Sequence, residues 1–288
     1  MLRDFAQDMG CHFYDVGEGI CHQLMVENEH VKPGDIFLGA DSHTPTYGAL
    51  NAFSAGVGST DLAAVMLTGK TWLKVPETIQ IELVGELPAG LSAKDIILHL
   101  VGKVGIAGAT YMSVEFTGET IHDFTLASRM VLANMAAEMG AKAGLVDPTG
   151  LDLWYDFTPT LADCDANYVQ KHTVHVSELK PQVAIPHLPS DVHDIDTIGE
   201  VKVNQAFIGS CTNARLEDLQ MAAQVLRGKK IASGVRLLIA PASRKVFNDA
   251  LADGTVSILS EAGATFMTSG CGPCVGTLGG IPADGDVI

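Results

Sequence analysis

Short apolar runs alternate with longer segments of helical periodicity along most of the chain. Residues 79–84 alternate apolar and polar side chains, which is typical of a half-exposed strand. Other short runs are mainly apolar and predict buried strands, at residues 36–40, 205–209, 235–240 and 264–267. Helical spacing predicts helices at residues 60–68, 91–100, 125–139, 216–226 and 243–251. Strands that alternate with helices favour parallel α/β layers.

Two stretches interrupt this pattern and predict domain boundaries. Pro76 separates a helix from the next strand, and residues 181–195 contain three prolines, as a linker does. We therefore expect a first α/β domain at residues 1–76 and a second at residues 77–195, with its linker at 181–195. A third α/β domain should occupy residues 196–288.

Composition narrows the class of protein. The 288 residues include 34 Asp and Glu against 18 Lys and Arg, so a nucleic-acid or anionic-membrane surface is not expected. No apolar run reaches the roughly 20 residues of a membrane span, and residues 1–8 lack the apolar core of a signal peptide. We expect a cytoplasmic protein whose six cysteines are thiols or metal ligands. Cys11, Cys21 and Cys164 lack a motif and are expected to be buried thiols.

Three further cysteines have the spacing of a metal site. Cys271 and Cys274 form a Cys-x-x-Cys turn around Gly272 and Pro273, and Cys211 lies far away in sequence. A structural zinc site takes four protein ligands, whereas three thiolates leave one position for water or substrate. A Cys-x-x-Cys pair also occurs in redox dithiols and zinc ribbons, so the spacing alone leaves these alternatives open.

The segment Asp41-Ser42-His43 follows the strand expected at residues 36–40. Open α/β sheets place their ligand crevice at the carboxyl ends of the strands, which favours a binding or catalytic site here. An ordinary turn, in which Asp41 and Ser42 bond backbone amides, explains these residues equally well.

Two motifs then identify a family. The segments 209–218 (GSCTNARLED) and 271–276 (CGPCVG) resemble the cluster-binding motifs of the aconitase superfamily, and within it the large subunits of 3-isopropylmalate dehydratase and homoaconitase. The resemblance implies three α/β/α domains around a central [4Fe–4S] cluster, with the first and third domains incomplete. Cys211, Cys271 and Cys274 are implied as the cluster ligands, and the fourth iron is free to bind substrate.

The resemblance also implies roles for other residues. One acid–base pair is formed by His22 and Asp41 and another by His43 and Glu138, and all four are implied to be catalytic. Ser42, Asn134 and Arg215 are implied as substrate contacts, with Asn134 and Glu138 four positions apart on one expected helix.

Two of the residues near Cys211 keep an alternative reading. Asn213 is implied as a cluster contact, although capping the following helix explains it equally well. Arg215 has a surface ion pair with Glu217 or Asp218 as its alternative.

The implied activity is that of a hydro-lyase acting on a hydroxy di- or tricarboxylic acid. The substrate expected first is 3-isopropylmalate, isomerised with 2-isopropylmalate in leucine biosynthesis. Homoaconitase and 2,3-dimethylmalate dehydratase are alternatives within the enzyme class, and a cluster-binding sensor or a structural zinc protein are alternatives outside it. The family's catalytic base lies on a swivelling domain or small subunit, so we expect a small-subunit partner. Compared with the family, the chain is expected to be truncated at both ends.

Overall fold

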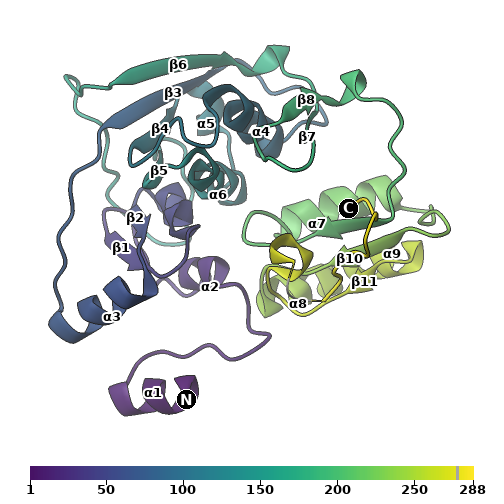
Figure 1. Ribbon diagram of the computed structural model, residues 1–288, viewed down its shortest axis with the longest axis horizontal. Coiled ribbons are helices and arrows are strands. Elements are labelled where there is room, and N and C mark those ends of the chain that lie inside the picture. The colour runs from purple at the N-terminus through teal and green to yellow at the C-terminus, as the bar shows by residue number, and fades with distance from the viewer. Residues whose placement is uncertain (277–278) are drawn as a thin grey trace. The chain divides into compact units, whose positions relative to one another are not determined.

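The computed structural model describes residues 1–276 and 279–288 and contains two compact units (Figure 1). Unit 1 consists of Met1–Leu24 and Lys202–Ile288, and unit 2 consists of Met25–Val201. This division differs from the expected partition, because the boundary expected at Pro76 lies inside unit 2. Residues on both sides of Pro76 share one apolar core, to which Leu50 and Ile81 both belong.

A four-stranded parallel sheet forms the centre of unit 2, with strand order β5-β4-β3-β6. Along β3, buried residues alternate with more exposed ones, as the sequence predicts. The strands are β3 (Thr78–Val84), β4 (Ser113–Thr117), β5 (Ala143–Val146) and β6 (Gln170–His175).

Helices of unit 2 cover this sheet, and α4 and α6 contact each other beside it (Figure 1). Ser92 caps α4 by accepting a hydrogen bond from Lys94 N, and Asp95 completes the predicted capping box. The helix expected at residues 125–139 is α6 followed by the short 3₁₀ helix η2, which ends at Gly140 with φ +81°. The helices are α4 (Ala93–Val104), α5 (Glu119–His122), α6 (Leu126–Met135) and η2 (Ala136–Met139).

A two-stranded parallel sheet precedes the larger one in the chain. Its first strand was expected to be buried, but Ile36 is 73% exposed because only β2 pairs with this strand. The helix η1 then packs so closely on β5 that a Cβ on Gly48 would lie 1.7 Å from Gly144 O. The elements are β1 (Ile36–Gly39), η1 (Thr44–Leu50), β2 (Phe53–Gly56) and α3 (Ser59–Thr68).

The segment expected as a linker, residues 181–195, is instead an ordered antiparallel hairpin within unit 2. Gln182 N donates to Asp95 Oδ1 at 3.0 Å, which attaches the hairpin to α4. Backbone pairing and this side-chain contact outweigh the proline content of the segment. The elements here are η3 (Val176–Glu178), β7 (Gln182–Ala184), β8 (Val192–Asp194) and η4 (Ile195–Thr197).

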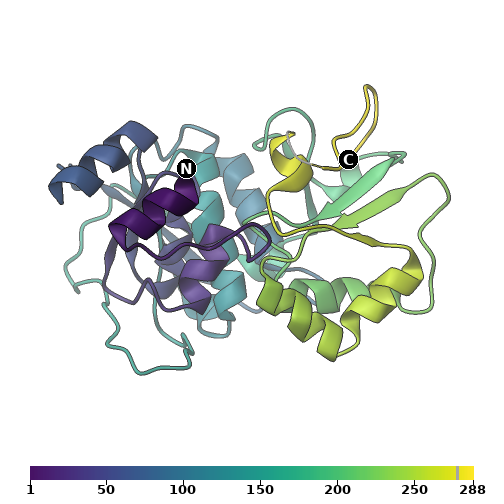
Figure 2. The ribbon, with the colours of Figure 1, turned by 90° about the horizontal axis from the view of Figure 1, so that it is seen from below.

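Unit 1 contains a three-stranded parallel sheet with strand order β11-β10-β9, and Figure 2 shows α7, α8 and α9 on one side of it. The central strand β10 is mostly buried, whereas the flanking strands are only partly buried, which corrects the expectation for residues 205–209 and 264–267. The elements are α1 (Leu2–Met9), α2 (Cys21–Glu27, which continues into unit 2), β9 (Gln205–Ile208), α7 (Leu216–Leu226), β10 (Arg236–Ile239), α8 (Arg244–Ala252), α9 (Thr255–Ala262), β11 (Thr265–Phe266) and η5 (Gly272–Val275).

The cysteines without a motif were expected to be buried, and this prediction is wrong. Cys11, Cys21 and Cys164 are all exposed. Cys11 follows the end of α1, and Cys164 lies in a stretch without helix or strand, so neither side chain is enclosed by packed elements. Among the described residues, no helix has the length and apolar character needed to cross a membrane.

Candidate functional site

In unit 2, the structure brings His43 and Glu138 together. His43 Nε2 lies 3.3 Å from Glu138 Oε1, and His43 Nδ1 lies 3.2 Å from Ser42 Oγ. The side chains of His43 and Glu138 are 27% and 34% exposed, so a ligand can reach both. A carboxylate that holds one imidazole nitrogen fixes the tautomer of the ring, which is the arrangement used in acid–base catalysis.

The hydrogen bond from His43 also shifts the ionisation of its partner. This hydrogen bond is the largest influence lowering the pKa of Glu138, and it outweighs the opposing effect of burial. Glu138 is therefore a carboxylate at neutral pH.

The turn that carries His43 is held by its own residues. Asp41 Oδ1 accepts a hydrogen bond from His43 N at 2.7 Å, and Asp41 O accepts one from Thr44 Oγ1 at 2.7 Å. Gly56 must lack a side chain here, since a Cβ would lie 2.6 Å from Asp41 O. Asp41 thus makes the turn bond that the sequence left as an alternative, while its carboxylate remains exposed beside the imidazole, with Oδ1 3.9 Å from His43 Nδ1.

Asn134 supports the same turn through a hydrogen bond to Thr46. It is fully buried, and its Nδ2 donates to Thr46 Oγ1 at 2.8 Å, while Thr46 Oγ1 donates to His43 O at 2.6 Å. Two consecutive helices therefore hold His43. Asn134 of α6 supports its backbone through Thr46, and Glu138 of η2 bonds its ring. Thr46 was not predicted, because a single threonine inside a short 3₁₀ helix carries no distinctive pattern.

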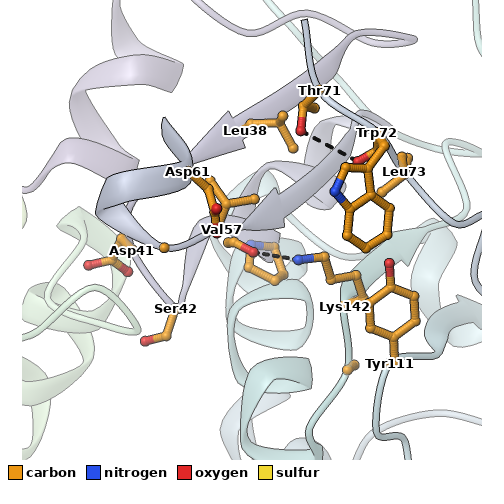
Figure 3. Close-up of a pocket in the computed structure, with 14 residues that line it drawn as sticks. Leu38, Asp41, Ser42, Val57, Asp61, Thr71, Trp72, Leu73, Tyr111 and Lys142 are labelled. Atoms are coloured by element: carbon orange, nitrogen blue, oxygen red, sulfur yellow. Dashed lines mark hydrogen bonds between the residues drawn. The ribbon is translucent and has the colours of Figure 1, made fainter. Parts of the chain in front are cut away.

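A cavity of about 480 Å³ opens beside Asp41 and Ser42 (Figure 3). Lys142 brings a cation to this cavity; its Nζ donates to Gly56 O at 2.6 Å and lies 5.8 Å from the centre of the Tyr111 ring. Figure 3 shows the rings of Tyr111 and Trp72 near the Lys142 side chain. The sequence offered no motif around Lys142, so this member of the cavity was not predicted.

In unit 1, the three motif cysteines come from loops at one edge of the parallel sheet. Cys211 follows β9, and Cys271 and Cys274 follow β11. Because the strands are parallel, the loops after them emerge at the same edge, where α/β sheets bind ligands. Cys211 and Cys271 are partly buried and Cys274 is exposed.

Left-handed backbone conformations bracket the loop of Cys211. Ser210 has φ +70° and Ala214 has φ +62°, although neither residue is glycine. Such conformations cost free energy and persist only where surrounding contacts impose them, which occurs most often at functional sites.

Asn213 and Arg215 make contacts that differ from their expected alternatives. Asn213 Nδ2 donates to Asp218 Oδ1 at 3.0 Å, and α7 begins only at Leu216, so Asn213 does not cap this helix. Arg215 is 5% exposed, so it is a buried side chain and not the surface residue of the alternative reading. Its guanidinium donates to Thr212 O at 2.5 Å, to Cys211 O at 3.0 Å and to Gln23 Oε1 at 3.0 Å.

His22 also belongs to unit 1 and is 2% exposed. The glycine-flanked turn before it is required by packing, because a Cβ on Gly19 would lie 2.9 Å from Ser243 Cβ. Its neighbour Gln23, which sequence reasoning missed, faces Arg215. Asp41, the implied partner of His22, belongs to unit 2.

The chemistry of the donor set in unit 1 fits an iron–sulfur cluster. Thiolates are the usual ligands of such clusters, and here three thiols lie on loops at one sheet edge. In the part of the chain that the structure describes, no three His, Cys, Asp or Glu side chains are already close enough to hold a single metal ion. The fit therefore rests on the donor set and its location.

The structure is thus an α/β protein with three motif cysteines after the strands of unit 1 and an imidazole–carboxylate pair, His43 and Glu138, in unit 2. The chain matches the aconitase family (aconitate hydratase) over residues 1–157 and 195–288. It belongs to the aconitase family, and this membership implies an iron–sulfur cluster.

Several relatives align with almost the whole chain, and two of them illustrate the similarity. The 3-isopropylmalate dehydratase large subunit 1 of Methanopyrus kandleri is 48% identical over 99% of this chain and 70% of its own length. A protein of Methanosarcina mazei named as a probable methanogen homoaconitase large subunit is 47% identical over 99% of this chain and 75% of its own length. With dehydratases among such relatives, the chain is an enzyme of the hydro-lyase class.

A solved structure confirms the fold. The holo-form of Thermococcus kodakaraensis aconitase X superimposes with a TM-score of 0.58 at 17% identity, over 93% of this chain. The chain spans 64% of the length of that protein. The aconitase-like α/β fold expected from the sequence is therefore confirmed.

Proposed function

We propose that the chain acts as the catalytic large subunit of a [4Fe–4S] dehydratase that interconverts 3-isopropylmalate and 2-isopropylmalate in leucine biosynthesis. One observation carries this proposal: the three cysteines of the family's two motifs lie on loops at one edge of the sheet in unit 1. The names of relatives, among them that of Methanopyrus kandleri, support the substrate. A reducing compartment such as the cytoplasm suits cysteines that act as cluster ligands.

Cys211, Cys271 and Cys274 would hold the cluster. When bound, such a cluster supplies an iron without a cysteine ligand, a Lewis acid that makes the substrate hydroxyl a better leaving group. The left-handed residues on either side of the Cys211 loop support this assignment, because they show a backbone held away from its preferred conformation at the thiol.

In unit 2, His43 handles the proton of the departing hydroxyl. Glu138 accepts a hydrogen bond from Nε2 and so holds the imidazole, while Ser42 bonds Nδ1 and lies at the cavity, where it can also contact the substrate. The exposed Asp41 carboxylate and the imidazole of His22 assist the proton transfer in this proposal.

The contacts of two residues favour positioning over substrate binding. Asn134 is fully buried and bonds Thr46, and the guanidinium of Arg215 is directed at the Cys211 loop. We therefore propose that substrate carboxylates are bound by other groups, some of them on the partner. The relatives are named as large subunits, which supports a small-subunit partner that carries the swivelling domain.

Homoaconitase is the second candidate. The Methanosarcina mazei relative named for that activity is 47% identical, almost as similar as the first. Its substrate is also a hydroxy polycarboxylate, so the same residues suit either reaction.

Anaerobic reconstitution with iron and sulfide tests the cluster. We expect about four irons per chain and an electron paramagnetic resonance signal that interconverts three-iron and four-iron forms. Cys274→Ser should abolish it, whereas Cys164→Ser, at an exposed thiol in unit 2, should not. Zinc binding without a cluster in the wild-type protein would refute the proposal.

Activity then separates the two candidates. The reconstituted chain is combined with the small subunit of the Methanopyrus kandleri or the Methanosarcina mazei relative, and each complex is assayed with 3-isopropylmalate and homocitrate. We expect turnover of 3-isopropylmalate; turnover of homocitrate alone in both complexes would favour homoaconitase.

A further inference from the structure

A buried guanidinium lies beneath the loop of Cys211. Each of the three nitrogens of the Arg215 guanidinium donates a hydrogen bond, to the backbone of Cys211, to the backbone of Thr212 and to the side chain of Gln23. Arg215 is 5% exposed, so these bonds are largely shielded from water. Charged donors in such a setting form stronger hydrogen bonds than neutral ones.

We propose that Arg215 and Gln23 are positioning residues that hold the backbone of Cys211 in the conformation needed for cluster ligation. This inference rests on the proposed function, and it assigns Arg215 to the cluster loop instead of to the substrate. The planar fork of arginine suits the role, because it reaches two successive carbonyl oxygens and a third acceptor at once.

The loop needs such support because its conformation is unfavourable by itself. Ser210 and Ala214 adopt positive φ angles, and the carbonyls of Cys211 and Thr212 lie between them. Without Arg215, these two carbonyls lose charged donors, and the loop can relax toward ordinary φ values. The thiol of Cys211 would then no longer be held in a single place.

Asp218 holds the end of the Cys211 loop that leads into α7. Its carboxylate accepts hydrogen bonds from Arg215 N at 2.9 Å and from Asn213 Nδ2 at 3.0 Å. Asp218, in the first turn of α7, thus holds Asn213 and the backbone of Arg215, while the guanidinium of Arg215 holds the carbonyl groups of Cys211 and Thr212.

Gln23 extends the support to the segment of His22. The chain before Gln23 is attached to unit 1 by backbone hydrogen bonds from Ile20 N to Ala242 O at 2.9 Å and from Arg244 N to Glu18 O at 2.8 Å. Gln23 therefore offers its amide oxygen from a fixed position. Through Arg215, it couples the placement of Cys211 to the segment that carries His22.

Alkylation of the apoprotein tests this support without a cluster. The rate at which iodoacetamide modifies Cys211 is measured by mass spectrometry, with exposed Cys164 as internal reference. Each lost hydrogen bond from a charged donor should raise the rate about tenfold. We expect a large increase in Arg215→Gln, a smaller one in Gln23→Leu and in Arg215→Lys, and none in Arg227→Gln, an exposed arginine at the other end of α7.

Chelator-driven cluster loss gives the second measurement. After anaerobic reconstitution, Arg215→Gln and Gln23→Leu should lose iron about 10–100-fold faster than wild type, with partial recovery in Arg215→Lys. The resonance of the three-iron form should broaden, because the Cys211 ligand is no longer fixed; a merely structural role would leave that resonance unchanged.

The outcomes separate this inference from the proposed function. If Cys211 alkylation is the same in wild type, Arg215→Gln and Gln23→Leu, the positioning role is overturned. If alkylation responds but wild type assembles no cluster, the support exists and its assigned purpose fails together with the proposed function. Should Arg215→Gln not fold, as judged by circular dichroism, Gln23→Leu decides, since it removes a single bond.

Discussion

Arg129 provides the most demanding stability prediction. This side chain is fully buried in unit 2 and donates hydrogen bonds to four backbone carbonyls, of Phe124, Asp147, Ile121 and Thr149, at 2.5–3.0 Å. Burial lowers the pKa of Arg129 to about 10, so the guanidinium is charged at pH 7. It joins the start of α6 to the loop after β5, and α6 leads to Glu138.

We expect Arg129→Met to destabilise unit 2 by about 3–5 kcal/mol, the usual cost of breaking a buried charged network. Methionine fills much of the space but leaves four carbonyls without their donor. Arg129→Lys keeps the charge and fewer of the hydrogen bonds, so its loss should be about 1–3 kcal/mol. The matched control is Arg227→Met, at an exposed arginine, which should stay within about 0.5 kcal/mol.

Hydrogen exchange of peptides from residues 119–150 is the assay, because it reports the stability of unit 2 alone in a chain with two units. The slowest amides in this segment give the free energy of opening. A loss below about 1 kcal/mol for Arg129→Met would contradict the reasoning, since the four carbonyls would then have found other partners.

Two predictions concern pH. The pKa of Glu138 is lowered chiefly by its hydrogen bond from His43, so the stability it contributes is present above its ordinary value near 4.5 and is lost as pH falls through the lower folded pKa. Glu138→Gln should therefore flatten the acid limb of a denaturation curve; an unchanged limb would show that the bond is weak in solution. Burial and a hydrogen bond to Glu115 raise the pKa of Tyr168 to about 12, so its contribution is complete below pH 10 and is lost as pH rises toward 12. Ultraviolet titration should show one late tyrosinate that disappears in Tyr168→Phe, and titration of every tyrosine near pH 10 would refute this.

The sequence predicted helices and strands well where the contacts that form them join residues close together in sequence. The helix expected at residues 216–226 has those bounds as α7, and the alternation along β3 reports its burial directly. Ser92 and Asp95 marked the start of α4, because a capping box is a contact between neighbours in sequence.

Burial was predicted less well because it depends on neighbours that are distant in sequence. Strand β1 is an apolar run, but it pairs with a single strand and leaves Ile36 exposed. The prolines of residues 181–195 suggested a linker, whereas Gln182 and Asp95 join this segment to α4. No pattern within either segment reports these contacts.

The candidate site divides in the same way. The motifs indicated the three cysteines, and the end of a predicted strand indicated the turn of His43. Both the spacing of ligand residues and the end of a strand can be recognised from the sequence alone. Gln23 and Thr46 were missed, and Asp218 was named only as an ion-pair partner of Arg215. These residues bond one or two partners in the folded chain, and such bonds leave no periodicity in the sequence.

The composition of unit 1 from both ends of the chain has a consequence for biosynthesis. Unit 2 is continuous, so it can fold on the ribosome while residues 202–288 are still being made. Residues 1–24 must wait for residues 202–288, and closing so long a loop costs only about 0.6 kcal/mol more for each doubling of its length. The loop of Cys211 therefore meets Gln23 only once residues 202–288 have been made, and iron and sulfide can be delivered only after the two segments of unit 1 have come together.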